Sequence, residues 1–146
     1  MKHYYHINIS QYNIVARTYG LDSNGNLINR SATNTQISNA LVGGTDLNGR
    51  FFSVNSTYYS GVPIPSKLIE ELYLQHPVIL SYSTGINTGH VVVLTSCEYY
   101  ISNNGPVITR LITCDPWPSV INISNNGFAA FSDINKILGF WIVRVY

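Results

Sequence analysis

Charged residues are scarce in this chain. They make up 10% of its 146 residues, well below the roughly 25% of an average soluble domain. Eight basic side chains against seven acidic ones give a net charge of +1, with no run of like charge. Nucleic-acid binding calls for a clustered basic face. The composition therefore argues against a nucleic-acid partner and predicts a surface solvated mainly by Asn, Ser, Thr, Tyr and Gly.

Long apolar runs are also lacking. No stretch approaches the roughly 20 residues of a membrane span, so we expect none. The N-terminal MKHYYHINIS lacks the apolar core of a signal peptide. The lack of a signal favours a cytoplasmic location by default, and secretion stays open if the chain is incomplete at that end.

Cysteine is limited to Cys97 and Cys114, which form no Cys-x-x-Cys pair. The four histidines show no zinc-ligand spacing with acids or thiols; they are His3, His6, His76 and His90. The sequence therefore predicts neither a metal site nor a cofactor.

The length predicts a single domain over residues 1–146. Residues 1–76 carry short helical patterns, separated by an exposed loop at 21–33 and an extended stretch at 50–61. From Pro77 onward, runs rich in β-branched and aromatic residues predict strands. We see no internal repeat. The expected helices are 11–18, 34–44 and 65–76, and the expected strands are 78–82, 91–100, 107–114, 119–124 and 139–146. Helices followed by an antiparallel meander define an α+β protein.

The turn cluster SNNG at 102–105 predicts a hairpin between two of these strands. If paired residue numbers sum to about 205, leaving a loop of roughly four residues, His90 lies directly opposite Asp115. Opposed residues share a face, with Cβ atoms about 4.5–5.5 Å apart. A carboxylate on one ring nitrogen would fix the tautomer and leave the other nitrogen as an acid or base.

The same register separates the two cysteines by about six residues, roughly 20 Å, so we expect free thiols. Cys97 lies seven positions beyond His90, and this odd offset predicts that it points to the opposite face. Cys114, next to Asp115, also points away. Neither cysteine is expected to serve His90 as a nucleophile.

Each of these residues also has a simpler interpretation. A lone histidine at a strand start is more often structural, and Asp115 before a proline is a common turn opener. Trp117 alone would be a core residue, and the cysteines would be small buried apolar side chains. The catalytic interpretation depends on the combination of these residues.

That combination resembles a known family. Gly89-His90 before an apolar strand, then a hairpin and Asp115-Pro116-Trp117, is similar to the second half of bacterial papain-like cysteine peptidases, a superfamily that includes bacteriocin-processing enzymes. The helix and strand at 68–82 belong to the same resemblance. It implies that His90 is the general base, that Asp115 orients it, and that Trp117, with Gly89 in support, shields their hydrogen bond. It also implies short helices packed on a twisted antiparallel sheet, or half-barrel, and a peptide or protein substrate.

The N-terminus departs from the family pattern. MKHYYHINISQ resembles the end of the family's nucleophile helix and the opening of the next helix. The resemblance then implies an N-terminally truncated domain whose nucleophilic cysteine, and the glutamine that donates to the oxyanion, would lie before Met1. A histidine base without its thiol should be inactive.

Three explanations stay open for a domain of this kind. The chain is a fragment of an active peptidase, or a pseudo-peptidase that binds through a vestigial cleft. A third possibility is an interaction protein whose 11 tyrosines contact a partner. That last explanation predicts that His90 and Asp115 are not adjacent.

Overall fold

The computed structural model describes residues 6–9, 11–28, 31–85, 88–114, 128–131 and 133–146. These residues form helices and a mostly antiparallel sheet, which confirms the α+β class. The chain divides into two compact units, Met1–Ser56 with Arg144–Tyr146 and Thr57–Val143. We call them the first and the second unit. A single domain over 1–146 stays a prediction. None of the described helices is long and apolar enough to cross a membrane.

The first unit contains two of the expected helices, α2 (Gln11–Tyr19) and α3 (Asn34–Ala40), and a small two-stranded sheet of β1 (Gly44–Thr45) and β2 (Phe51–Phe52). Helix α2 ends at Gly20, whose positive φ of 75° lets its amide bond back to the Ala16 carbonyl. Helix α3 begins with a capping box, in which Thr33 and Gln36 bond to each other's backbone amides. Local capping signals therefore set these helix ends.

Two turns of the first unit share the sequence Asp-x-Asn-Gly, at Asp22 and at Asp46. Each carboxylate accepts hydrogen bonds from the amides two and four residues later, at 2.8 Å in the first turn and 2.9 Å in the second. Gly25 and Gly49, with φ near 79° and 78°, donate to the carbonyl of the same aspartate. The hydrogen bonds to the two carboxylates lower the pKa of both carboxyls. The largest cause is the amide four residues later for Asp22 and the Asn8 amide for Asp46. This repeated turn was not predicted from the sequence.

The second unit is built on the larger sheet, whose strand order is β3-β8-β4-β5-β6-β7. The pairings from β8 through β7 are antiparallel. Strand β3 belongs to the extended stretch expected before Pro77, so the sheet draws on more of the chain than residues 77–146. The strand expected at 119–124 lies outside the described residues. The strands are β3 (Val54–Ser60), β4 (Val78–Gly85), β5 (Thr88–Ser102), β6 (Gly105–Cys114), β7 (Phe128–Phe131) and β8 (Ile137–Val145).

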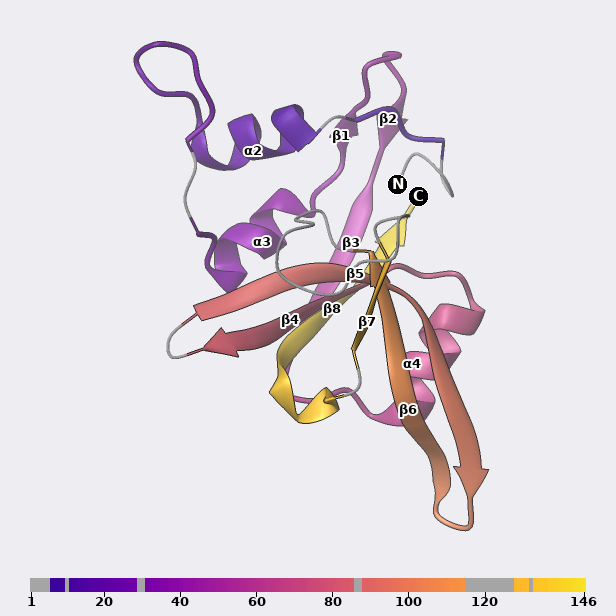
Figure 1. Ribbon diagram of the computed structural model, residues 1–146. Helices are drawn as coiled ribbons and strands as arrows, with labels where there is room; N and C mark the ends of the chain where they lie inside the picture. Colours follow the sequence, from indigo (N-terminus) through magenta and orange to yellow (C-terminus); the bar gives the residue numbers. More distant parts are fainter. Residues whose placement is uncertain (1–5, 10, 29–30, 86–87, 115–127, 132) are drawn as a thin grey trace. The chain divides into compact units, whose positions relative to one another are not determined.

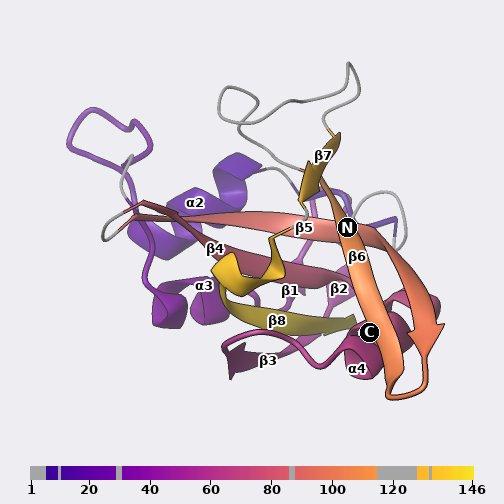
Figure 2. The ribbon, with the colours of Figure 1, turned by 60° about the horizontal axis from the view of Figure 1, so that its bottom comes forward.

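Helix α4 (Pro65–Tyr73) packs against β4, β5 and β6 in this unit (Figures 1 and 2). Its Leu68 and Leu72 pack in the main apolar cluster, to which the strands contribute alternate residues. The short 3₁₀ helix η1 (Ile134–Lys136) adds Ile134 to the same cluster. The buried members of the cluster are Leu68, Val78, Leu80, Tyr82, Val92, Leu94, Ile108, Leu111, Ile137, Phe140 and Ile142.

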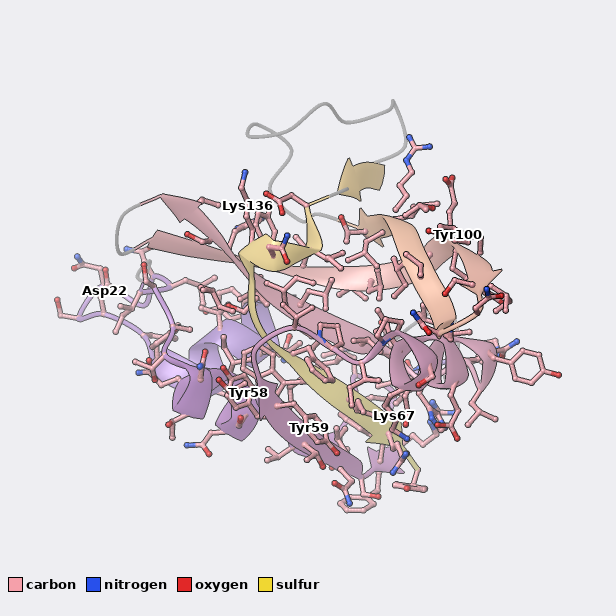
Figure 3. All side chains as sticks on the ribbon, turned by 90° about the horizontal axis from the view of Figure 1, so that it is seen from below. Asp22, Tyr58, Tyr59, Lys67, Tyr100 and Lys136 are labelled. Atoms are coloured by element: carbon pink, nitrogen blue, oxygen red, sulfur yellow. The ribbon has the colours of Figure 1, made fainter. Side chains whose placement is uncertain are left out.

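Aromatic side chains of β3 pack along β8 (Figure 3). The ring of Tyr58 lies 4.7 Å from that of Trp141, and Tyr59 stacks on Phe140 at 5.0 Å between centroids. A Cβ at Gly139 would come within 2.7 Å of ring atoms of Tyr58. The absence of a side chain at Gly139 is therefore what lets Tyr58 lie across β8.

Helix α4 ends in a Schellman motif with a residue other than glycine at its left-handed position. The His76 amide donates to the Glu71 carbonyl, and the Gln75 amide to that of Leu72. Gln75 has φ of 59°, a conformation that costs an L-residue about 1–2 kcal/mol. The motif is formed against the local preference of its sequence.

We therefore expect Gln75→Gly to stabilise the protein by about 0.5–1 kcal/mol, because relief of the strain exceeds the added chain entropy. Chemical denaturation of the two proteins measures the difference. Gln75→Ala is the matched control, since it shortens the side chain and keeps the strain. A glycine variant no more stable than the alanine variant would contradict this reasoning.

Candidate functional site

His90 lies near the start of β5, with its backbone paired to Tyr82 of β4. Tyr82 in turn pairs with Ile137 of β8, so three adjacent strands place these residues in one row. Strand alternation puts His90 on the same face as Val92 and Leu94, both of which are buried in the main cluster. The imidazole itself is half-buried. It therefore lies on the apolar face of the sheet and keeps partial access to solvent.

The imidazole pairs with the ring of Tyr82. The two ring centroids are 5.7 Å apart and the ring planes meet at 88°, an edge-to-face arrangement. Tyr82 is only 5% exposed and belongs to the main cluster. A buried side chain thus flanks the candidate base.

Gly89 precedes His90 and pairs with Ser83. A Cβ at Gly89 would meet the Tyr82 carbonyl oxygen at 3.4 Å and Leu138 Cδ1 at 3.6 Å, which are ordinary contacts. The described neighbours therefore do not require a glycine there, and its supporting role stays a prediction.

Asp115 and Trp117 lie outside the described residues, so their predicted contacts with His90 stay predictions. The assumed register can be checked over the rest of the hairpin, and there it is wrong. Ser102 pairs with Gly105 and Val93 with Cys114, so paired numbers sum to 207 at both ends of the ladder. Gly105, with φ of 104°, closes a tighter turn than the assumed loop of about four residues.

Both thiols are free, in agreement with the expectation. The predicted direction of Cys97 was wrong. A β-bulge at Thr95, between the Leu94 and Ser96 pairings, shifts the alternation by one residue. Cys97 therefore packs against the main cluster, and burial raises its pKa because it disfavours the thiolate.

Neither thiol is placed to react with His90. Cys97 lies seven residues along the same strand, about 23 Å away at 3.3 Å per residue. Cys114 is exposed and pairs with Val93, which points to the face opposite His90. Its Cα is about 11 Å from that of His90 by strand spacing. A thiolate–imidazole pair within the described part of this chain is therefore excluded by geometry.

A second cluster of titratable groups, not predicted from the sequence, lies at the end of α4. The carboxylate of Glu71, only 1% exposed, accepts from Lys67 Nζ at 2.8 Å and contacts His76 Nδ1 at 2.7 Å. The hydrogen bond to Glu71, and a second one to Glu70, raise the pKa of Lys67, which is labelled in Figure 3. The i, i+4 spacing of Lys67 and Glu71 was the available signal.

This cluster has a structural explanation. A carboxylate only accepts hydrogen bonds, so Nδ1 of His76 carries the proton at this contact. The pair closes the C-terminal turn of α4 beside the Schellman motif, and a buried charge needs such partners. Among the described residues, no group of three His, Cys, Asp or Glu side chains is arranged to hold a metal ion.

A pocket of about 210 Å³ lies in the first unit. Its lining contains no His, Cys, Asp or Glu side chain, so it offers no acid, base or nucleophile. It is lined by Ile7, Arg50, Phe51, Phe52, Val145 and Tyr146.

Comparisons with family models, with curated proteins and with solved structures found no match for this chain. The family resemblance therefore rests on the sequence motifs alone.

Proposed function

We propose that this chain carries the histidine base and the orienting aspartate of a papain-like cysteine peptidase domain, and that it acts on peptide or protein substrates. One observation supports this most. His90 lies near the start of a strand, half-buried against a buried tyrosine, on an antiparallel sheet that also packs a helix. A base in this position is both oriented and reachable.

In the proposed chemistry, His90 takes a proton from a cysteine thiol, and the thiolate attacks the scissile carbonyl to form an acyl-enzyme. Protonated His90 then gives the proton to the leaving amine, and a water molecule releases the acyl group. Asp115 holds the ring in the required tautomer, and Trp117 shields that hydrogen bond from water. Cys97 and Cys114 are unsuited to the nucleophilic role, so the thiol is one that these 146 residues do not supply.

We therefore expect the purified 146-residue chain to show no thiol-dependent peptidase activity. A mixture of fluorogenic peptides tests this, with and without prior alkylation of the protein by iodoacetamide. Both samples should match the buffer blank, because a base without its thiol leaves the reaction without an attacking group. Hydrolysis that disappears on alkylation of Cys97 or Cys114 would refute the proposal that neither cysteine is the nucleophile.

The placement of Asp115 has its own test. A crystal structure should show a carboxylate oxygen of Asp115 within hydrogen-bonding distance of a ring nitrogen of His90. A separation beyond about 6 Å, outside the range in which opposite charges favour each other's charged form, would overturn the catalytic assignment.

The alternative function is a pseudo-peptidase or interaction module, favoured by the surface of the β5–β6 hairpin. Tyr99, Tyr100 and Ile101 near its turn are all exposed, and Tyr100 is labelled in Figure 3. Exposed aromatic and aliphatic side chains are typical of contact surfaces. This alternative predicts that a chain supplied with the family's thiol segment binds peptides, by fluorescence anisotropy, and does not cleave them.

A further inference from the structure

The row that contains His90 lies between two irregularities of the sheet. On one side, the β4–β5 register shifts between Ser83 and Gly85. On the other, the β4–β8 register shifts between Ser81 and Tyr82. Bulges re-aim the side chains beside them and are over-represented next to active sites. Both shifts lie within three residues of Tyr82 along β4, and β4 lies beside β5 in Figure 1.

An imidazole at the start of a strand is not oriented by its backbone. Its second side-chain torsion is broad and roughly two-fold, so the ring needs neighbours to select one orientation. Tyr82 is such a neighbour, because its ring is buried in the main cluster and meets the imidazole edge to face at 5.7 Å. Edge-to-face ring pairs contribute attraction beyond simple burial.

We infer that Tyr82 is a positioning residue for His90. Its ring, aimed by the two bulges, restricts the imidazole to the orientation in which a ring nitrogen can reach a thiol. The catalytic meaning of this role rests on the proposed function. The restriction of the His90 ring by Tyr82 does not, because it can be measured in the protein without substrate. Reach matters because a catalytic base works within about 2.6–3.2 Å of the proton it takes, and a misplacement of 1 Å can cost about 10²-fold in rate.

The test is side-chain NMR of the isotope-labelled chain, with the His90 signals assigned by their loss in His90→Gln. In the wild type, nuclear Overhauser effects should connect ring protons of Tyr82 and His90. Tyr82→Phe, which keeps the ring, should leave the His90 ring shifts unchanged. Tyr82→Leu, which keeps an apolar side chain and removes the ring, should move them towards free-imidazole values and raise the ring's mobility in relaxation measurements. Tyr99→Leu, an exposed site remote along β5, is the control and should change nothing at His90.

Unchanged His90 signals in Tyr82→Leu would overturn the inference. Changed His90 signals in Tyr82→Phe would also overturn it, because the effect would then come from the hydroxyl and not from the ring. If Tyr82→Leu does not fold, the wild-type measurement decides, because missing ring-to-ring Overhauser effects also overturn it. None of these readouts needs catalysis. A failure of the proposed function, seen as no hydrolysis even when a thiol segment is supplied, is therefore distinguishable from a failure of the positioning role.

In a chain supplied with the thiol segment, Tyr82→Leu should lower kcat and leave KM within about two-fold of its value, because orientation of the base acts on the transition state. Tyr82→Phe should restore kcat. A parallel loss in both variants, or a change confined to KM, would contradict a positioning role.

Discussion

Gly43→Ala should destabilise the first unit by about 3 kcal/mol, at the upper end of the usual cost of overpacking. A Cβ at this position would lie on the backbone carbonyl oxygen of Phe52 and within 2.6 Å of Ser53 Cα. Backbone atoms cannot rotate away as a side chain can, so either the chain at 43 or that at 52–53 has to move. The Gly43 carbonyl also accepts a hydrogen bond from Arg17 at 3.1 Å, which such a movement would disturb.

Two other alanine substitutions are matched controls. At Gly44, the described atom that a Cβ would meet is the end of the flexible Arg17 side chain, at 2.9 Å. At Gly89, the nearest atoms are at ordinary contact distance. We expect both to lie within about 1 kcal/mol of the wild type. Hydrogen exchange at the Phe52 amide, together with denaturant unfolding, measures the three variants. Equal stability of Gly43→Ala and Gly44→Ala would contradict the close approach.

The elements of this fold follow from local sequence signals. Helix α3 begins at its Thr33–Gln36 capping box, and α2 ends at a glycine in the left-handed conformation. The β-branched runs before and after residues 102–105 form strands, as expected. These signals act over a few residues, so they can be recognised in the sequence without knowledge of tertiary contacts.

Register and facing were not predictable in the same way. The pairing of β5 with β6 is set by Gly105 at the turn and shifted by a bulge at Thr95. The bulge carries no distinctive sequence, and it alone decides that Cys97 faces the core. A pattern of strict alternation cannot anticipate an inserted residue.

In the candidate site, too, local features were predictable from the sequence and features that depend on strand register were not. His90 was identifiable because Gly-His before an apolar strand is a local pattern, whereas Tyr82 was not. Its contact with His90 depends on the pairing of β4 with β5 and on two register shifts. Glu71 was also missed as a buried carboxylate, because its partners include a histidine brought back by the left-handed turn at Gln75.

The largest functional effect is expected in a chain extended at its N-terminus by a Cys-Trp helix of the kind that the family resemblance implies. An in-frame Cys-Trp in the coding sequence before Met1 would supply the natural version of this segment. The extended chain should hydrolyse peptides, and His90→Ala in that background should lower kcat/KM by about 10³-fold or more. A general base contributes 10²–10⁴-fold, and a nucleophile and its base lose activity as one unit.

His76→Gln is the matched control for the loss of an imidazole. His76 is also half-buried and also contacts a carboxylate, that of Glu71 at 2.7 Å. A glutamine can still donate a hydrogen bond to that carboxylate, so the turn at the end of α4 should survive. We expect this variant to retain activity within about three-fold, because the Glu71–His76 pair closes a helix and has no role in the proposed mechanism. Equal losses in the two variants would show that the measured effect is structural. Full activity in His90→Ala would remove His90 from the mechanism and leave the interaction module as the function that the exposed hairpin surface supports.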